Sequence, residues 1–153
     1  MKKEKWRVLA EKHLPYYESL CPQAKNRAGI YMITVDDVPV YVGQSKNLLL
    51  RIASHESAIY DKENDEYNKT KYKLLREAKE KGHSICFEIL HYVSDEDLPL
   101  LDIIEAWNID KYNPPLNIIH PEINGHPTYH DNNYKNYTDF ERYISGKAVS
   151  ASA

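Results

Sequence analysis

The sequence predicts an α+β fold in which helices pack on a small, largely antiparallel sheet. Two adjacent runs of β-branched and aromatic residues are separated only by Asp36-Asp37, and a third such run begins after residue 83. Helical patterns lie before and after the third run, so the expected order is two strands, two helices, a strand and a helix. The 153 residues suit one domain, which at this size can bury a core without disulfides.

The first two strands are expected to form a hairpin. Residues 29–35 and 38–42 are rich in Val, Ile, Thr and Tyr, and the two aspartates between them favour a turn. Pro39 places the second strand at an edge or near its start, and Gly43 should end it. Before the hairpin, residues 5–14 predict a short helix that ends before Pro15.

Two helical segments follow the hairpin. Ser45 is expected to cap a helix over residues 46–57, because a serine hydroxyl can accept a free backbone N–H of the first turn. The apolar residues of this segment form one stripe that should face the core: Leu48, Leu49, Ile52 and Ala53. Residues 68–81 predict a second, highly charged helix that ends at Gly82.

The third strand and the last predicted helix complete the sheet layer. Residues 84–91 alternate in the manner of a half-buried strand, with Ile85, Phe87 and Ile89 on one side. Ser94 precedes three acidic residues that suit the positive end of a helix, so a helix over 96–112 is predicted. Asn113-Pro114-Pro115 should stop it.

The composition indicates a cellular location and limits the kinds of partner that are expected. Cys21 and Cys86 match no metal-ligand spacing, which favours reduced thiols and a cytoplasmic location. No segment resembles an export signal or approaches the roughly 18 apolar residues of a membrane span, so a membrane partner is not expected. The net charge of −3 argues against a nucleic-acid partner. The charge is uneven, however, because residues 1–28 hold seven basic and three acidic side chains, so a local basic face remains open.

Several residues could carry chemistry, and each also has an ordinary explanation. Glu105 lies on or beside a core-facing stripe, so it should be paired, metal-bound or at the rim of a cleft, unless it sits exposed at the stripe's edge. Arg51 and His55 are four apart, so they share a helix face and could reach one anion, or could simply be solvated. Tyr31 and Tyr41 in strands would usually be packing residues.

Considered together, these residues form a known pattern. Gly29-Ile30-Tyr31 is followed ten residues after its tyrosine by Tyr41-Val42-Gly43, and then by Ser45, Leu48, Arg51 and His55. This ordered set, over about residues 28–118, resembles the GIY-YIG nuclease family, with valine in place of isoleucine in the second motif. Glu105 resembles the family's metal-binding glutamate and Asn117 its downstream asparagine. The resemblance implies a small three-stranded antiparallel sheet flanked by helices, and the Arg51/His55 spacing favours the restriction-enzyme branch.

The resemblance implies a DNA endonuclease that hydrolyses phosphodiesters by in-line attack of water. One divalent ion, Mg²⁺ or Mn²⁺, would bind Glu105, hold the scissile phosphate and stabilise the leaving oxygen. Arg51 would neutralise the phosphate from the other side.

The tyrosines and the asparagine would handle the water and the phosphate. By resemblance, Tyr31 contacts or helps deprotonate the attacking water. His55 is a candidate partner for it, because an unaided phenol with a pKa near 10 is a poor base at pH 7. Tyr41 and Asn117 would position phosphate and water through hydrogen bonds.

DNA contacts beyond these residues are expected from lysines that could instead be merely solvated: Lys46, Lys69, Lys71 and Lys73. We expect a basic helical extension over 1–27, a nuclease domain over 28–118, and a Tyr/Asn-rich extension over 119–153 docked on that domain. Two alternatives remain open: a binding module that keeps the fold without cutting, and a structure-selective repair or recombination nuclease. A homodimer is a further option for a protein of this size.

Overall fold

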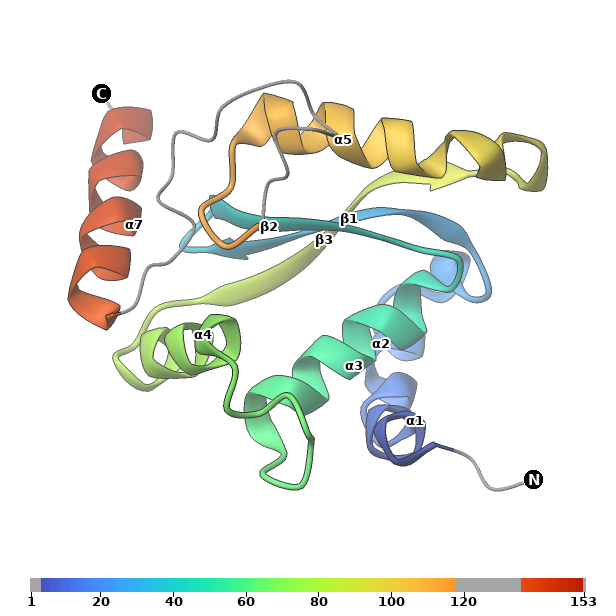
Figure 1. The fold of residues 1–153 in the computed structure, drawn as a ribbon, viewed down its shortest axis with the longest axis horizontal. Coiled ribbons are helices and arrows are strands. Elements are labelled where there is room, and N and C mark those ends of the chain that lie inside the picture. Colours follow the sequence, from blue (N-terminus) through green and yellow to red (C-terminus); the bar gives the residue numbers. More distant parts are fainter. Residues whose placement is uncertain (1–3, 118–135, 153) are drawn as a thin grey trace.

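The computed structural model describes residues 4–117 and 136–152, with side chains to residue 147. Its centre is an antiparallel sheet of three strands in the order β2-β1-β3. The strands are β1 (Ala28–Val35), β2 (Val38–Ser45) and β3 (Ile85–Val93). The predicted fold class is therefore confirmed (Figure 1).

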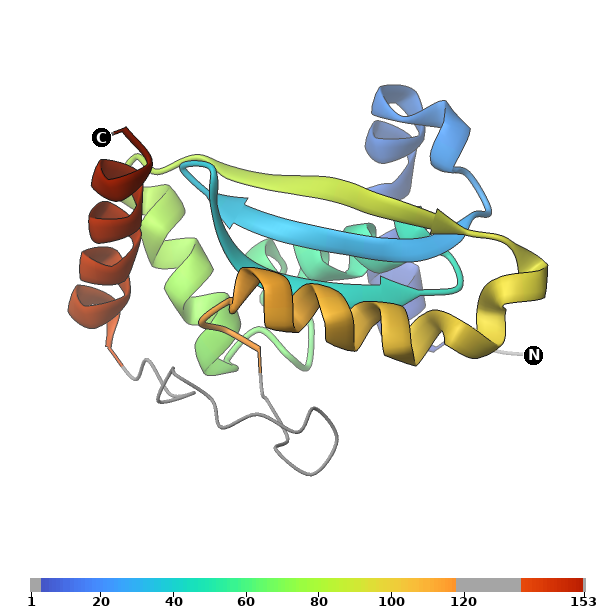
Figure 2. The same cartoon turned by 90° about the horizontal axis from the view of Figure 1, so that it is seen from above.

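Helices cover both faces of the sheet (Figures 1 and 2). One face carries α3 (Leu48–Tyr60) and α4 (Thr70–Glu80), with α1 (Lys5–Glu11) and α2 (Leu14–Leu20) packed against α3. The other face carries α5 (Leu101–Tyr112), which follows a short 3₁₀ helix, Asp95–Leu100. The last helix, α7 (Tyr137–Ser152), lies at the end of the sheet beside α4.

Alternation along β1 divides the core into two clusters, because successive strand residues point to opposite faces. Tyr31, Ile33 and Val35 belong to the larger cluster beneath α3 and α4, whereas Ile30 and Met32 belong to a smaller one beneath α5. All eight residues of β1 are buried, as expected for a central strand.

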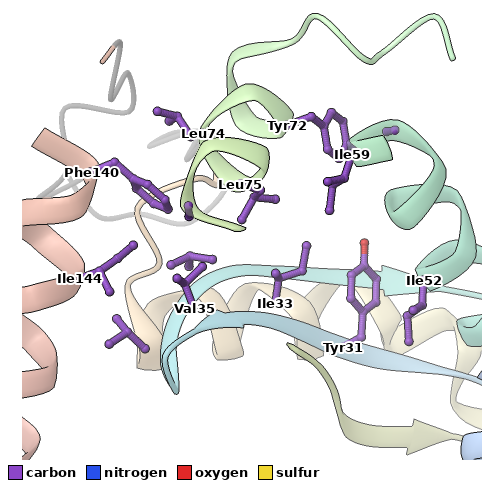
Figure 3. Packing of buried hydrophobic residues seen from close by; sticks show 14 of the residues in the cluster. Tyr31, Ile33, Val35, Ile52, Ile59, Tyr72, Leu74, Leu75, Phe140 and Ile144 are labelled. Carbon is purple, nitrogen blue, oxygen red and sulfur yellow. The ribbon is translucent and has the colours of Figure 1, made fainter. Parts of the chain in front are cut away.

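The end of the chain contributes to the larger cluster (Figure 3). Tyr137, Phe140 and Ile144 of α7 are buried there, and Tyr143 is half-buried against the same cluster. These residues of α7 pack on the larger cluster, while Tyr129 and Tyr134 lie outside the described residues. The division of the chain at residues 27 and 118 stays a prediction.

Near the N-terminus the structure corrects the single helix predicted over residues 5–14. Two short helices, α1 and α2, occupy this segment, and Pro15 lies in the first turn of α2 instead of behind the end of a helix. A proline is tolerated there because the first backbone N–H groups of a helix have no partner within it. The proline thus starts a helix in this chain.

The end of the hairpin also differs from the prediction. Gly43 does not end β2, which continues to Ser45. The N-cap of α3 is Asn47, whose Oδ1 accepts the Leu50 backbone N–H at 3.3 Å. Ser45 acts one step earlier, since its Oγ accepts from the Asn47 N–H at 2.9 Å and donates to the Asn47 carbonyl. Two side chains therefore share the strand-to-helix turn.

The helix predicted over residues 96–112 is divided. Residues 95–100 form a 3₁₀ helix that contains Pro99, and the α-helix begins at Leu101. Ser94 makes no side-chain cap; its Oγ donates to Asp97 Oδ2 at 3.2 Å. At the other end, Asn113 adopts a left-handed conformation with φ 45°, which terminates α5 before the two prolines, as predicted.

Two expectations from composition were examined directly. Cys21 and Cys86 are both free thiols. Among the described residues, no helix has the length and apolar character needed to cross a membrane.

Candidate active site

Three side chains from three different elements form a buried hydrogen-bonded chain. Tyr31 projects from β1 toward the helices, and its Oη lies 2.5 Å from Nε2 of His55 on α3. The other imidazole nitrogen, Nδ1, lies 2.8 Å from Oη of Tyr72 on α4. The exposed fractions of Tyr31, His55 and Tyr72 are 1%, 0% and 1%. Figure 3 shows Tyr31 rising from the sheet and Tyr72 descending toward it from α4.

Tyr41 and Arg51 border this chain. The Tyr41 ring centroid lies 5.5 Å from that of His55 and 6.2 Å from that of Tyr31. Arg51 is half-buried one helical turn before His55, with its guanidinium 3.3 Å from Ser54 Oγ. Because Tyr31, Tyr41, Arg51 and His55 come together as the sequence predicts, the first half of the expected site exists as one cluster.

Burial controls the protonation of the cluster. Burial, followed by the neighbouring Tyr41 hydroxyl, raises the pKa of Tyr31 well above 10, and the Arg51 guanidinium opposes this shift. Burial, followed by the charges of Arg51 and Lys71, lowers the pKa of His55 well below 6.5. Near neutral pH the imidazole is therefore uncharged, with one N–H and one bare nitrogen.

The glycines of both motifs are explained by close approaches. A β-carbon at Gly43 would overlap the hydroxyl and ring carbons of Tyr31, which lies directly opposite it in the β1-β2 ladder. A β-carbon at Gly29 would overlap the backbone carbonyl of His91 on β3. Only a residue without a side chain leaves room at either position. The glycine of the second motif thus lies opposite the tyrosine of the first motif and leaves room for its ring.

Glu105 lies on α5, on the opposite side of the sheet from His55. Gln44 of β2 holds it: the Gln44 Nε2 donates to Glu105 Oε1 at 3.3 Å and also to Asp102 Oδ1. Burial raises the pKa of Glu105, Asp102 adds to the shift, and the Gln44 hydrogen bond and Arg51 oppose it. The Glu105 carboxylate adds to the rise in the pKa of Tyr41, and the Arg51 guanidinium opposes the rise in the pKa of Glu105.

The donor set near Glu105 suits a hard cation with few protein ligands. Its carboxylate is half-buried, and carboxylate and amide oxygens are ligands that Mg²⁺ prefers. Within residues 4–117 and 136–152, no group of three or more His, Cys, Asp or Glu side chains converges on a point. An ion here would thus be held by Glu105 together with water and substrate oxygens.

Asn117 has contacts that differ from those expected. Its Oδ1 accepts the Val42 backbone N–H at 2.8 Å, and its Nδ2 donates to the Val42 carbonyl at 2.8 Å. The preceding residue, Leu116, donates its backbone N–H to the Val40 carbonyl at 2.9 Å. Instead of reaching toward phosphate, the buried Asn117 amide fixes β2 between Tyr41 and Gly43.

Of the four lysines expected to contact DNA, the structure brings one to the cluster. Lys71 Nζ lies 4.1 Å from the ring centroid of Tyr41 and 4.8 Å from that of Tyr72. Burial and the Arg51 charge lower the pKa of Lys71 to about 8. Lys46 and Lys73 are exposed, as is Lys69, which pairs with Glu66 at 3.3 Å. DNA contacts by these three stay a prediction.

A cavity of about 400 Å³ adjoins the cluster. Arg51 and Tyr72 line it on one side, and Trp6 and Leu9 of α1 line it on the other.

Sequence reasoning missed two residues of the site. Tyr72 lies within the highly charged helix predicted over residues 68–81, and Gln44 directly follows the second motif without belonging to it. The strand alternation could have indicated Gln44, because it pairs with Ile30 and shares the α5 side of the sheet. The partnership of Tyr72 with His55 depends on how α4 packs, which no local pattern records.

Comparison with known proteins agrees with this geometry. Residues 27–117 match the GIY-YIG catalytic domain family. Endonuclease II of Enterobacteria phage T4 is 31% identical over 99 residues, which cover 60% of this chain and 72% of that protein. The structure of a mutant of bacteriophage T4 EndoII gives a TM-score of 0.47 at 29% identity, covering 61% of this chain and 75% of that one. This relative is a phage endonuclease, so it lends no support to the restriction-enzyme branch. The chain belongs to the GIY-YIG endonuclease family.

Proposed function

We propose that this protein cuts DNA by divalent-metal-dependent, in-line hydrolysis of phosphodiesters, with Arg51, Tyr31 and Glu105 as its catalytic residues. The observation that carries the proposal is that adjacent residues of β2 adjoin both groups: Gly43 lies against Tyr31, which is hydrogen-bonded to His55, and Gln44 donates to the half-buried Glu105 carboxylate. GIY-YIG nucleases generally use a divalent metal, and the related phage protein is named an endonuclease.

Each group has a distinct task. Arg51, always charged, neutralises the phosphate as negative charge grows on its oxygens. Tyr31 orients the attacking water and takes its proton, while His55 accepts the hydrogen bond of the phenol. Bound at Glu105, Mg²⁺ or Mn²⁺ would supply Lewis-acid stabilisation of the leaving oxygen. Tyr41 packs beside His55 and turns its ring to Lys71.

Asn117 acts through the backbone in this proposal. By holding Val42 from both sides, it sets the positions of the flanking Tyr41 and Gly43. Since Gly43 contacts the Tyr31 hydroxyl, a shift of β2 would displace the proposed base.

The first experiment is a cleavage assay with single-stranded, double-stranded and branched DNA, with Mg²⁺, with Mn²⁺ and with neither. We expect metal-dependent cuts, and Glu105→Gln should abolish them, a loss of at least about 10³-fold, while DNA binding measured by fluorescence anisotropy persists. Glu88→Gln, an exposed carboxylate on β3, is the matched control. Binding without cleavage by the unaltered protein would favour the non-cutting module, and cuts confined to branched DNA would favour the structure-selective nuclease.

We further propose that two copies act together on double-stranded DNA, because the described part of one chain presents one such cluster and a double-strand break needs two cuts. Light scattering of the protein with and without a DNA duplex measures this directly. A monomer in both samples would refute it.

A further inference from the structure

Tyr72 is the one member of the buried chain that the proposed reaction has not yet used. Its hydroxyl lies 2.8 Å from His55 Nδ1, on the side of the imidazole opposite Tyr31. Tyr72 also lines the 400 Å³ cavity beside Arg51. The chain from Tyr31 through His55 thus runs from the proposed attacking water to a residue that lines this cavity.

The two hydrogen bonds restrict the imidazole. Because neutral His55 has one N–H, one nitrogen donates and the other accepts. If Tyr31 is to lose a proton to Nε2, that nitrogen must be bare, and the proton of the ring must lie on Nδ1. Nδ1–H then donates to the Tyr72 oxygen, which can accept it because a phenol is both donor and acceptor.

His55 is poorly placed to keep a proton that it receives. The groups that face it come from every element around it: Tyr31 of β1, Tyr41 of β2, Arg51 of α3, Lys71 and Tyr72 of α4, and Phe87 of β3. Two of these are basic and none is a carboxylate. An imidazolium here would be buried beside a guanidinium, which is strongly unfavourable. A proton entering at Nε2 therefore has to be matched by one leaving at Nδ1.

We propose that Tyr72 is a positioning and relay residue that holds His55 with its proton on Nδ1 and receives that proton during cleavage. This inference rests on the proposed nuclease function. As the water attacks, its proton moves to the Tyr31 oxygen while the Tyr31 proton moves to His55 Nε2. The Nδ1 proton passes to the Tyr72 oxygen, and the Tyr72 proton passes to water in the adjoining cavity. One proton leaves, no group in the chain changes its charge, and His55 ends in its other tautomer.

The relay explains why a phenol can serve as the base. The pKa of Tyr31 is raised, so a free phenolate is rare at neutral pH, but a concerted transfer does not require one. Lys71, with its pKa lowered to about 8, lies over the Tyr72 ring and keeps positive charge near the exit. Its charge, like that of Arg51, disfavours storage of a proton on His55, so a proton that enters at Nε2 has to be matched by one that leaves at Nδ1.

The decisive measurement is nitrogen-15 NMR of the imidazoles in the metal-free, DNA-free protein, which reports the tautomer without any turnover. The chain has seven histidines, and a His55→Gln spectrum assigns the signal. We expect a protonated Nδ1 and a bare Nε2 in the unaltered protein. The reverse tautomer would overturn the inference, whether or not the protein cuts DNA.

The second measurement uses Tyr72→Phe, which removes one oxygen and keeps the ring. We expect the single-turnover cleavage rate to fall about 10- to 100-fold at unchanged DNA affinity. The solvent isotope effect in mixtures of H₂O and D₂O should change from a curved dependence, typical of several protons in flight, to a nearly linear one. Tyr60→Phe, at an exposed phenol on α3, is the control and should change neither.

Failure of the inference is distinguishable from failure of the nuclease proposal. Absence of cleavage by the unaltered protein refutes the nuclease function, while the NMR tautomer still tests Tyr72. Cleavage by Tyr72→Phe at the normal rate, with the same curved isotope dependence, refutes the relay alone. Thermal unfolding of each variant establishes that the fold persists.

Discussion

The two faces of the sheet present different kinds of groups to the proposed site. Beneath α3 and α4, Tyr31, His55 and Tyr72 are fully buried and satisfy one another as neutral groups. Beneath α5, Glu105 is only half-buried. Burial raises the pKa of its carboxyl group, and the hydrogen bond that the carboxylate accepts comes from the uncharged Gln44 amide. The enclosed face is suited to moving a proton, and the open face to binding a cation.

Neighbouring residues of β2 serve the two faces separately. Gly43 lies against Tyr31 on the α3 side, and Gln44 reaches Glu105 on the α5 side. The period of two in a strand thus places the groups proposed to handle the proton and the proposed cation ligand on opposite sides of the sheet. Single substitutions at adjacent positions can therefore disturb one face and spare the other.

The largest effect is expected from Gly43→Ala, which breaks the enclosed face. The new methyl group would overlap the Tyr31 hydroxyl. His55 lies against the same hydroxyl, so the phenol cannot move away without losing that hydrogen bond. We expect the cleavage rate to fall about 10²-fold or more, because displacement of a reacting group by about 1 Å has that consequence. Stability should also fall, by about 1–3 kcal/mol.

Gly146→Ala on α7 is the control for this substitution, since a methyl group there meets open space. Steady-state cleavage and urea unfolding of both variants provide the comparison. Full activity in Gly43→Ala would show that Tyr31 is not confined as described.

A smaller effect is expected from Gln44→Ala, which breaks the open face. Without its amide, Glu105 and Asp102 lose the donor that orients them, and metal affinity should fall about 10-fold or more. Titration with Mn²⁺, followed by electron paramagnetic resonance, measures the affinity. The His55 tautomer should be unchanged, and Gln23→Ala, at an exposed position, should leave both properties as they were. A shift in the tautomer would mean that the two faces are not independent.

The smallest effect concerns stability far from the site. His83 lies 2.5 Å from Asp36 in the hairpin turn and 3.0 Å from Glu141 on α7. These hydrogen bonds raise the pKa of His83 and lower the pKa of Asp36. The pKa of Glu141 is also lowered, first by the hydrogen bond that it accepts from Tyr137 and then by His83. The contribution of the His83 imidazolium to the free energy of unfolding is complete below about pH 6.5, the pKa of histidine in the unfolded chain. It is lost as the pH rises through the raised pKa of His83 in the folded protein.

The carboxylate contribution has the opposite sign. The stabilisation by the two carboxylates is complete above about pH 4, the pKa of such groups in the unfolded chain. It is lost as the pH falls through their lowered pKa values in the folded protein. His83→Gln should therefore lower the unfolding temperature most between about pH 4.5 and 6.5 and little at pH 9. The exposed His91→Gln is the control, and an effect independent of pH would contradict the ion-pair explanation.

The sequence predicted those features that depend on local order. The hairpin, its motif glycines and the Arg51/His55 spacing follow from patterns within about 30 residues, and the structure places these residues together. The errors arose where two local rules competed. Pro15 lies in the first turn of a helix, Asn47 and not Ser45 is the N-cap of α3, and Pro99 lies within a 3₁₀ helix that precedes α5.

The contacts that sequence reasoning missed are nonlocal. Tyr72 is 17 residues from His55, and Gln44 is 61 residues from Glu105, so no periodicity connects them. The change in the role of Asn117 has the same origin. Its residue type indicated a polar contact, but only the packed structure shows that the contact is with the Val42 backbone.

That contact has a consequence for assembly. Because β2 is an outer strand of the sheet, its outward N–H and C=O groups could recruit a strand from another molecule. Leu116 and Asn117 already occupy them at Val40 and Val42, so the chain seals this border with its own atoms. Within the described residues β3 pairs with β1 alone. Growth of the sheet by strand addition is thereby directed to the β3 border, away from the tyrosines and Glu105.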